Sequence, residues 1–474
     1  MKKNSATEKK SMSLKKVYQL NLAGGLLQTQ LRSDHELVVL AGEIDWEGFE
    51  DSLKCKYSLV GRQAKRVRLM LGLHILKHLY NLSDERVCRM LDENIYFRYF
   101  CGVHEDLTEW QASQLLNPCT MSRFRERLGV DGMQLVEDLI KRQLMKDGRI
   151  SGRTQVVDTT AMEKNIRYPT NTNLLAKGIE RVRKVVGKLV KLGLSVTVRS
   201  YERVVRKEIL KVNKLGRGRQ DRIADATSKL IGYARQVSKA ADVSFRAIRK
   251  GATEATESAI EAGKKALQEE LEKLDRVVSQ SVKRLAGEAI PASEKILSMH
   301  QPKVVVIAKG KRGKRYEFGA KVSLSMDRNG YVVGHQEYQE NRADVNTLDP
   351  ALEDWRRTFG DYPEELGADR GYTATNPTEA LSKVSKVAIP KRGKKRHPDH
   401  DKAYFRRVLK TRNKIEPTIG HLKTDHRLNR CRYSGAEGDT FNVGFATISW
   451  NLKKWAKEIQ AENRKELQRT RRAS

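Results

Sequence analysis

The amino-acid sequence predicts a mixed α/β fold, and three kinds of local pattern support this prediction. Short β-branched runs at residues 154–162 and 304–307 are typical of strands, and residues 316–325 alternate apolar with polar side chains. Residues 327–330 read Asp-Arg-Asn-Gly, which predicts a hairpin turn into a further strand. Residues 344–359 carry apolar side chains at helical spacing. Strands that alternate with helices in this way form a sheet covered by helices.

Two further short strands and one long helical stretch complete this prediction. The strands are expected within residues 363–372 and 384–390, and the first of them ends in an acid beside a glycine turn. Residues 174–298 contain little glycine, have proline only at Pro291, and are dominated by Arg, Lys, Glu, Ala, Leu and Val. We expect long helices there, arranged as a helical hairpin or a coiled-coil arm and inserted after the first strand.

Helical patterns also dominate the chain before the first strand. Residues 61–102 carry a broad apolar stripe interrupted by a polar turn, and Ser83 is the expected N-cap of the helix that follows. The aromatic side chains within residues 96–100 are expected in the core rather than as a platform for stacking bases. Arg123 and Arg127 share one face of a short helix with an apolar back. Such a helix can dock on a DNA duplex, and a solvated surface helix is the alternative.

The overall charge points to a polyanionic partner. The chain of 474 residues has a formal net charge of +33, which favours nucleic acid over a membrane surface. It contains no run of 18 or more apolar residues and no signal-peptide pattern, so we expect neither a membrane span nor secretion. The 5 cysteines are odd in number and lack paired spacing. They are expected to be reduced thiols in a cytoplasmic protein.

These patterns predict a division of the chain into five parts. The expected parts are a polar N-terminal segment (1–60), a helical DNA-binding domain (61–150), an α/β catalytic domain in two pieces (151–173 and 299–450), a helical insertion (174–298) and a basic C-terminal helix or tail (451–474). The chemistry is expected in the α/β domain, because three separated carboxylates fall within it.

The first of these carboxylates is Asp158, which stands inside a predicted strand where an acid is disfavoured, so it either faces solvent or serves a function. Asp369 ends a strand beside a glycine turn, and Glu416 precedes Pro417, which biases Glu416 away from the helical region and suits the first turn of a new helix. Arg412 lies four residues before Glu416. On spacing alone, Arg412 and Glu416 are an ordinary surface ion pair on one helix face.

Three carboxylates match the chemistry of a divalent-metal site. Mg²⁺ prefers oxygen ligands and keeps several waters, so two or three carboxylates suffice to bind it. Two such ions can clamp the attacking and leaving oxygens of a phosphoryl transfer. The sequence contains no Walker-type glycine loop, no HExxH and no GxSxG. His421 and His426 are five residues apart, which points them to different helix faces and argues against a metal pair.

At these residues the chain resembles the DDE transposases of bacterial insertion sequences, with the greatest similarity to the IS-five-type (IS-four-like) group. The resemblance extends in order over about residues 60–455 and rests on Asp158-Thr159-Thr160, on Asp369-Arg370-Gly371-Tyr372, and on Arg412-x3-Glu416-x6-Lys423 followed by Asp425-His426-Arg427-Leu428. The third pattern matches three of the four places of the family's tyrosine–arginine–glutamate–lysine motif. Leu409 stands where the family has the tyrosine.

The resemblance implies a ribonuclease-H-like catalytic core, with the long helical insertion after its first strand and a helical domain before it. It implies that Asp158, Asp369 and Glu416 are catalytic and bind two Mg²⁺ ions, for which Mn²⁺ can substitute. The reaction would cleave DNA at transposon ends and join the released 3′-hydroxyl to target DNA. Arg412 and Lys423 would hold phosphate near the cut, and further DNA contacts are expected from Arg370, Arg123 and Arg127.

The expected partner is double-stranded DNA, as terminal inverted repeats and as target, with a homodimer forming when two ends are synapsed. The expected location is the cytoplasm, in association with the nucleoid. Two alternatives remain open at this stage. One is a nuclease of the same fold that cuts without joining, and the other is a DNA-binding derivative without catalysis.

Overall fold

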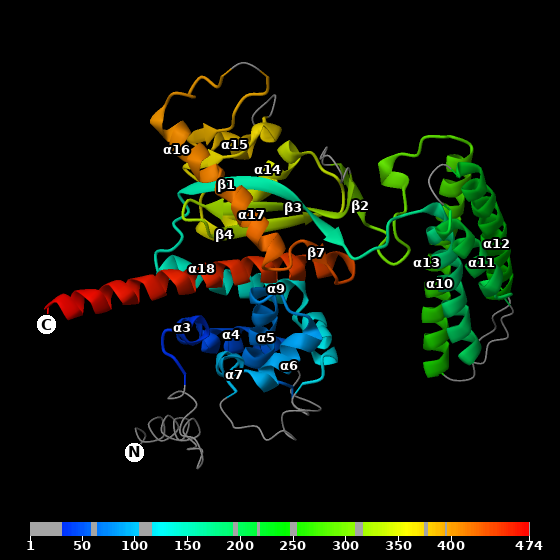
Figure 1. Cartoon of the computed structure of the whole chain (residues 1–474), viewed down its shortest axis with the longest axis horizontal. Helices are drawn as coiled ribbons and strands as arrows, with labels where there is room; N and C mark the ends of the chain where they lie inside the picture. The colour runs from blue at the N-terminus through cyan, green and yellow to red at the C-terminus, as the bar shows by residue number, and fades with distance from the viewer. Residues whose placement is uncertain are drawn as a thin grey trace, which may run out of the picture. The chain divides into compact units, whose positions relative to one another are not determined.

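The computed structural model describes residues 31–57, 64–103, 116–192, 198–215, 219–246, 254–308, 316–373, 378–393 and 396–473 (Figure 1). Residues 1–30 of the expected polar N-terminal segment therefore lie outside the described residues. The chain divides into two compact units. The first contains Met1–Met162, Lys321–Tyr338 and Arg342–Ser474, and the second contains Glu163–Ala320 and Gln339–Asn341. Within the described residues, no helix is long and apolar enough to span a membrane.

A mixed sheet forms the centre of the first unit, which confirms the α/β prediction. Its long strands are β1 (Thr154–Lys164) and β3 (Tyr316–Asp327), which lie side by side. β4 (Val332–Tyr338) pairs antiparallel with β3, and β5 (Glu365–Gly367) pairs parallel with β1. β6 (Lys386–Ala388) pairs parallel with β5, and the short β7 (Arg430–Cys431) pairs with β1.

The predicted hairpin turn joins β3 to β4. The carboxylate of Asp327 accepts hydrogen bonds from the backbone N–H groups of Asn329, at 3.0 Å, and Tyr331, at 2.9 Å. Gly330 has φ 91°, a conformation that favours glycine. The turn therefore forms for the reason that the sequence indicated.

Helices cover both faces of the sheet, and the alternation of side chains along β1 decides what each face contacts. Val157 packs with Leu348 and Leu352 of α14 (Leu348–Phe359), which follows the short 3-10 helix η3 (Asp344–Thr347). Val156 faces the other way and packs with Ile415 of α17 (Ile415–Thr424). Figure 1 shows α17 next to β1 and β3. Asp158 is two residues after Val156, so its side chain lies on the α17 face.

A second helix, α16 (Ala403–Arg412), precedes α17 and packs on β5 and β6. Phe405 and Val408 of α16 are fully buried and contact Ala388 of β6. The approach to β5 is close, because a Cβ atom added at Gly367 would lie 2.8 Å from Val408. This packing fixes the end of α16, where Arg412 stands.

The helices before β1 share one apolar core with the long helix α18 (Gly435–Ala473). They are α3 (Glu36–Glu43), α4 (Trp46–Leu53), α5 (Val67–Leu79), α6 (Asp84–Glu93), α7 (Ile95–Phe100) and α9 (Cys119–Lys146), with the 3-10 turn η1 (Lys54–Lys56) after α4. The predicted N-cap is confirmed, since Ser83 Oγ accepts a hydrogen bond of 3.1 Å from the N–H of Arg86. Phe97 and Phe100 are buried, as expected of core aromatics.

Two features of this helical region differ from the sequence-based expectation. The expected polar segment contains α3 and α4, whose Leu37 and Phe49 are fully buried, because each helix turns an apolar stripe inward despite its acids. The short helix expected to carry Arg123 and Arg127 is the first part of α9, which continues to Lys146 after a kink at Gly129, where φ is 66°. Local acids obscured α3 and α4 in the sequence, and a glycine obscured the length of α9.

The second unit contains the predicted helical insertion. Its helices α10 (Asn171–Lys191), α11 (Glu202–Asn213), α12 (Gln220–Arg246) and α13 (Glu254–Leu285) confirm the helical prediction. They pack as a bundle around Leu175, Val182, Leu230 and Leu274, all fully buried. The expectation of a hairpin or coiled-coil arm is wrong, because each helix has an apolar face broad enough to contact more than one neighbour. After η2 (Ala292–Glu294), β2 (Val305–Ala308) pairs with the first residues of β3.

Candidate active site

The three carboxylates stand on three separate elements of the first unit. Asp158 lies in the middle of β1, as predicted. Asp369 follows β5 by two residues and caps the 3-10 helix η4 (Arg370–Tyr372), where its Oδ1 accepts a 2.7 Å hydrogen bond from the N–H of Gly371. Glu416 is the second residue of α17. The sequence-based positions of all three acids within their elements are confirmed.

The backbone around Glu416 shows why proline is tolerated there. α16 ends at Arg412 and α17 begins at Ile415, so Asn413 and Lys414 form a short turn between the two helices. Pro417 is the third residue of α17, where a missing N–H removes no intrahelical hydrogen bond. Glu416 itself is helical, so the expected bias away from the helical region is wrong. The helix start nevertheless presents its carboxylate as expected.

The guanidinium of Arg412 brings the three carboxylates together. Its Nη2 lies 3.1 Å from Asp158 Oδ2 and 3.9 Å from Asp369 Oδ2. Its Nη1 donates to Glu416 Oε1 at 2.7 Å. The side chain of Arg412 is only 15% exposed. The Arg412–Glu416 pair is therefore part of a partly buried cluster and is not an ordinary surface ion pair.

The electrostatics of this cluster favour additional positive charge. Burial, with smaller contributions from the charges of Asp369 and Glu416, raises the pKa of Asp158 to about 6, although Arg412 and the N–H of Thr159 oppose the shift. Three carboxylates surround one guanidinium, whose buried Nε makes no hydrogen bond within the part of the chain that the structure describes. The cluster thus has one positive group for three negative ones.

The donor set fits hard divalent cations, which bind carboxylate oxygens. Among the described residues, however, no three Asp, Glu, His or Cys side chains are arranged around a common metal position. In this arrangement the guanidinium of Arg412 contacts each of the three acids. A guanidinium that contacts all three acids marks the place where a cation is electrostatically favoured.

A fourth acid, Asp344, lies next to the three carboxylates around Arg412, and the sequence did not predict its place there. Its Oδ1 accepts hydrogen bonds of 2.6 Å from Thr159 Oγ1, next to Asp158, and of 2.6 Å from Lys321 Nζ. A Cβ atom added at Gly371 would lie 2.9 Å from carboxylate oxygens of both Asp344 and Asp369. A side chain at position 371 would therefore force these two carboxylates to move. No local pattern distinguishes Asp344, which only the fold brings to Asp158 and Asp369.

The cations expected to contact DNA have different surroundings. Arg370 is exposed, and its carbonyl accepts a 3.2 Å hydrogen bond from Nε of Arg392, an exposed cation that the sequence reasoning missed. Lys423 is seven residues after Glu416 on α17 and is partly exposed. Arg123 and Arg127 are both exposed on α9, with the Arg127 guanidinium 5.0 Å from the centre of the Tyr57 ring.

Leu409 stands at the place of the family's motif tyrosine. It is partly buried on α16 and packs against Phe405 and Val408. An apolar side chain therefore continues the contact of α16 with the sheet.

Comparison with known proteins identifies two segments of the chain. Residues 26–127 match the family model described as Transposase domain (DUF772), and residues 295–452 match the model described as Transposase DDE domain. A Rhizobium meliloti protein described as "Uncharacterized protein ORF8 in nfe locus" is 34% identical over 190 residues, which cover 39% of this chain and 86% of that protein. No solved structure matches the chain. The DDE match contains Asp369 and Glu416, two of the three clustered acids, and the chain belongs to the DDE transposases of insertion sequences, metal-dependent enzymes that cut and join DNA.

Proposed function

We propose that this transposase binds the ends of its transposon and uses Asp158, Asp369 and Glu416 to cleave DNA and join it to a target. The single observation that carries the proposal is the convergence of these three carboxylates on Arg412. They come from a strand, a turn and a helix that are far apart in the sequence. Acids that were only packing or solubilising would not need to share one partly buried cation.

The sheet supports a ribonuclease-H-like core. β1 carries Asp158 in its middle, the parallel neighbour β5 leads to Asp369, and α17 on the same face supplies Glu416. The site thus lies on one face of a mixed sheet, toward the carboxyl end of β5. The order of the motifs also favours the IS-five-type group within the family.

The same three carboxylates would hold two Mg²⁺ ions, with Mn²⁺ as a substitute. When bound, such ions activate the attacking oxygen and neutralise charge on the phosphate. In cleavage, a bond forms between water oxygen and phosphorus, the bond from phosphorus to the 3′-oxygen breaks, and that oxygen takes a proton. In joining, the released 3′-hydroxyl loses its proton as its oxygen bonds to a phosphorus of the target, and the displaced target 3′-oxygen takes a proton.

The residues of this chain contribute position and charge to both steps. Arg412 contacts all three acids, so with cations bound its guanidinium would remain beside the site and could hold a phosphate oxygen. Lys423 lies two helical turns after Glu416, on nearly the same face of α17, and can contact a neighbouring phosphate. Arg370 with Arg392 supplies positive charge beside Asp369.

The proposed partners are double-stranded DNA and a second copy of the chain during synapsis of two ends. The exposed arginines Arg123 and Arg127 of α9 are proposed to bind DNA backbone outside the catalytic site. Loss of either charge would then weaken binding to any DNA sequence, because phosphate contacts carry no base information.

Incubation with a duplex that ends in the inverted repeats flanking the gene tests the proposal. With Mg²⁺ and target DNA, we expect a nick that leaves a 3′-hydroxyl at the repeat and a joined product that depends on the target. Cleavage that never yields a joined product would favour a nuclease. Salt-dependent binding without cleavage in Mg²⁺ or Mn²⁺ would favour a catalytically silent DNA-binding protein.

A further inference from the structure

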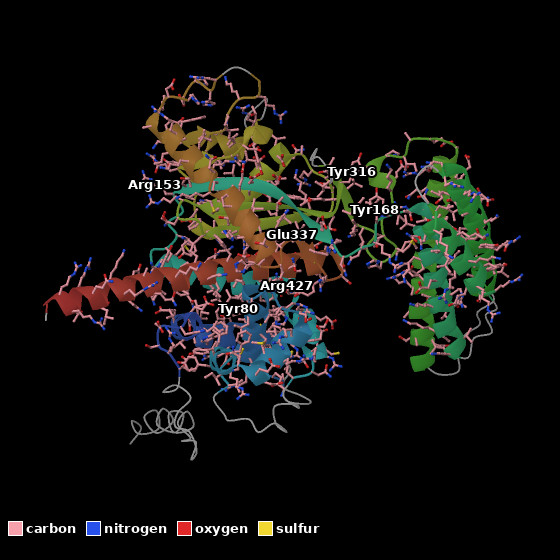
Figure 2. All side chains as sticks on the ribbon, viewed as in Figure 1. Tyr80, Arg153, Tyr168, Tyr316, Glu337 and Arg427 are labelled. Carbon is pink, nitrogen blue, oxygen red and sulfur yellow. The ribbon has the colours of Figure 1, made fainter. Side chains whose placement is uncertain are left out.

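A basic pocket of the first unit lies at the amino-terminal end of β1. It is a pocket of about 400 Å³ lined by Arg153, Thr154, Arg328, Asn329, Glu365, Arg407 and Thr411, here called the arginine pocket. Figure 2 shows Arg153 at the beginning of β1. The lining contains three guanidinium groups and one carboxylate, so positive charge is in excess.

The single carboxylate of the pocket orients one of its arginines. The side chain of Glu365 is 3% exposed, whereas that of Arg407, which donates to it, is 58% exposed. Thr154 Oγ1 also donates to Glu365, at 3.0 Å. The buried carboxylate of Glu365 thus holds Arg407 in place, while much of the Arg407 side chain remains exposed to solvent.

The other two arginines complete a cationic rim. Arg153 pairs with Glu364 at 2.7 Å, with side chains 54% and 37% exposed. Arg328 is exposed in the turn between β3 and β4, and no acid in the described part of the chain pairs with it. An exposed guanidinium without an acidic partner is available for an external anion.

The pocket lies on the same two elements, β1 and α16, that carry Asp158 and Arg412. Thr154 is four residues before Asp158 in β1, which corresponds to about 13 Å along the strand. Thr411 directly precedes Arg412 at the end of α16. The distance of about 13 Å is shorter than one helical turn of a duplex, which is about 34 Å.

We propose that the arginine pocket binds a backbone phosphate of the DNA within one helical turn of the reacting phosphate. This inference rests on the proposed function, because it assumes that DNA reaches Asp158, Asp369 and Glu416. Guanidinium forks match phosphate geometry, and an open pocket of this size accommodates one phosphodiester. The contact would set the register of the duplex without reading its sequence.

Arg328→Ala tests the pocket with little risk to folding, because the side chain has no acidic partner to leave behind. The binding constant of the full-length protein for a duplex would be measured without divalent metal over a range of salt concentrations. We expect the slope of log affinity against log salt to become shallower by about 1, the loss of one phosphate contact. Arg328→Lys should retain most of the slope. Arg356→Ala, which removes a 54% exposed arginine of α14, is the matched control and should not change it.

Neutral methylphosphonate substitutions locate the contact. On transposon-end duplexes substituted at one phosphate at a time within a helical turn of the cleavage position, one substitution should weaken wild-type binding and have a smaller effect on Arg328→Ala. If the wild-type protein cleaves DNA but Arg328→Ala and Arg407→Ala both keep the wild-type salt slope, phosphate binding by the pocket is wrong and the proposed function stands. A shallower slope in a protein that never cleaves would support phosphate binding and reject the catalytic proposal.

Discussion

Asp158→Asn, Asp369→Asn and Glu416→Gln are each expected to lower the rate of strand cleavage at least about a thousandfold, equivalent to about 4 kcal/mol of transition-state stabilisation. Each change keeps the shape of the side chain and removes one anionic ligand from the cluster around Arg412. Bound metal would then be lost or misplaced, and charge on the phosphate would be left without compensation. Single-turnover cleavage of a labelled transposon-end duplex in Mg²⁺ measures the effect.

Asp361→Asn is the control for these three variants. Asp361 is exposed beyond the end of α14, and its carboxylate accepts a hydrogen bond from the following backbone N–H. Its replacement should leave cleavage unchanged. All variants should bind DNA at least as tightly as the wild type in the absence of metal, because a negative charge is removed. Cleavage at a wild-type rate by any of the three cluster variants would contradict the assignment of that acid.

Asp84→Ala is expected to destabilise the helical region by about 3–5 kcal/mol, because it leaves two buried cations without their shared anion. Lys77 Nζ lies 2.6 Å from Asp84 Oδ1, and Arg125 Nη2 lies 3.0 Å from Asp84 Oδ2. The side chains of Lys77 and Arg125 are 4% and 10% exposed. Lys77 also donates to the hydroxyl of Tyr433 at 2.6 Å. The buried group of Lys77, Asp84 and Arg125 therefore links α5, α6 and α9 to the segment before α18. Urea unfolding followed by far-UV circular dichroism measures the loss.

Glu93→Ala is the matched control in the same helix. Glu93 pairs with Arg86 at 3.2 Å, and the two side chains are 47% and 46% exposed. An exposed pair of this kind contributes at most about 1 kcal/mol, so the control should unfold close to the wild type. Equal destabilisation by Asp84→Ala and Glu93→Ala would show that the buried cluster does not stabilise the region.

The same cluster predicts a dependence of stability on acid pH. Burial alone would raise the pKa of Asp84, but Lys77 and Arg125 lower it from 3.8 to about 2. Its contribution is therefore fully present above pH 3.8 and is lost as the pH falls through about 2. Asp84→Ala should flatten this part of the unfolding profile.

Much of the α/β layer was predictable because its signals are local. β-branched runs, an Asp-Arg-Asn-Gly turn and a proline in a first helical turn fix backbone conformation within a few residues. Asp158 was recognisable because an acid in an apolar strand is unusual. Ser83 was recognisable because a capping residue acts on the next turn alone.

The relations between distant elements were not predictable in the same way. Asp344 reaches Thr159 across 185 residues, and Arg412 reaches Asp158 across 254. These contacts depend on the pairing of β1 with β5 and on the packing of α17 against Val156, which no local pattern encodes. The arginine pocket likewise forms only when β1, β5, α16 and the hairpin turn come together.

The central claim is that Asp158, Asp369 and Glu416 form one site for divalent cations. Anomalous diffraction from crystals of the protein grown or soaked with Mn²⁺ tests it most directly. We predict two Mn²⁺ ions bound to oxygen atoms of these three carboxylates, with the guanidinium of Arg412 displaced from between them. Mn²⁺ bound only at other residues, with Arg412 still in contact with all three acids under conditions in which the enzyme cleaves DNA, would contradict the claim.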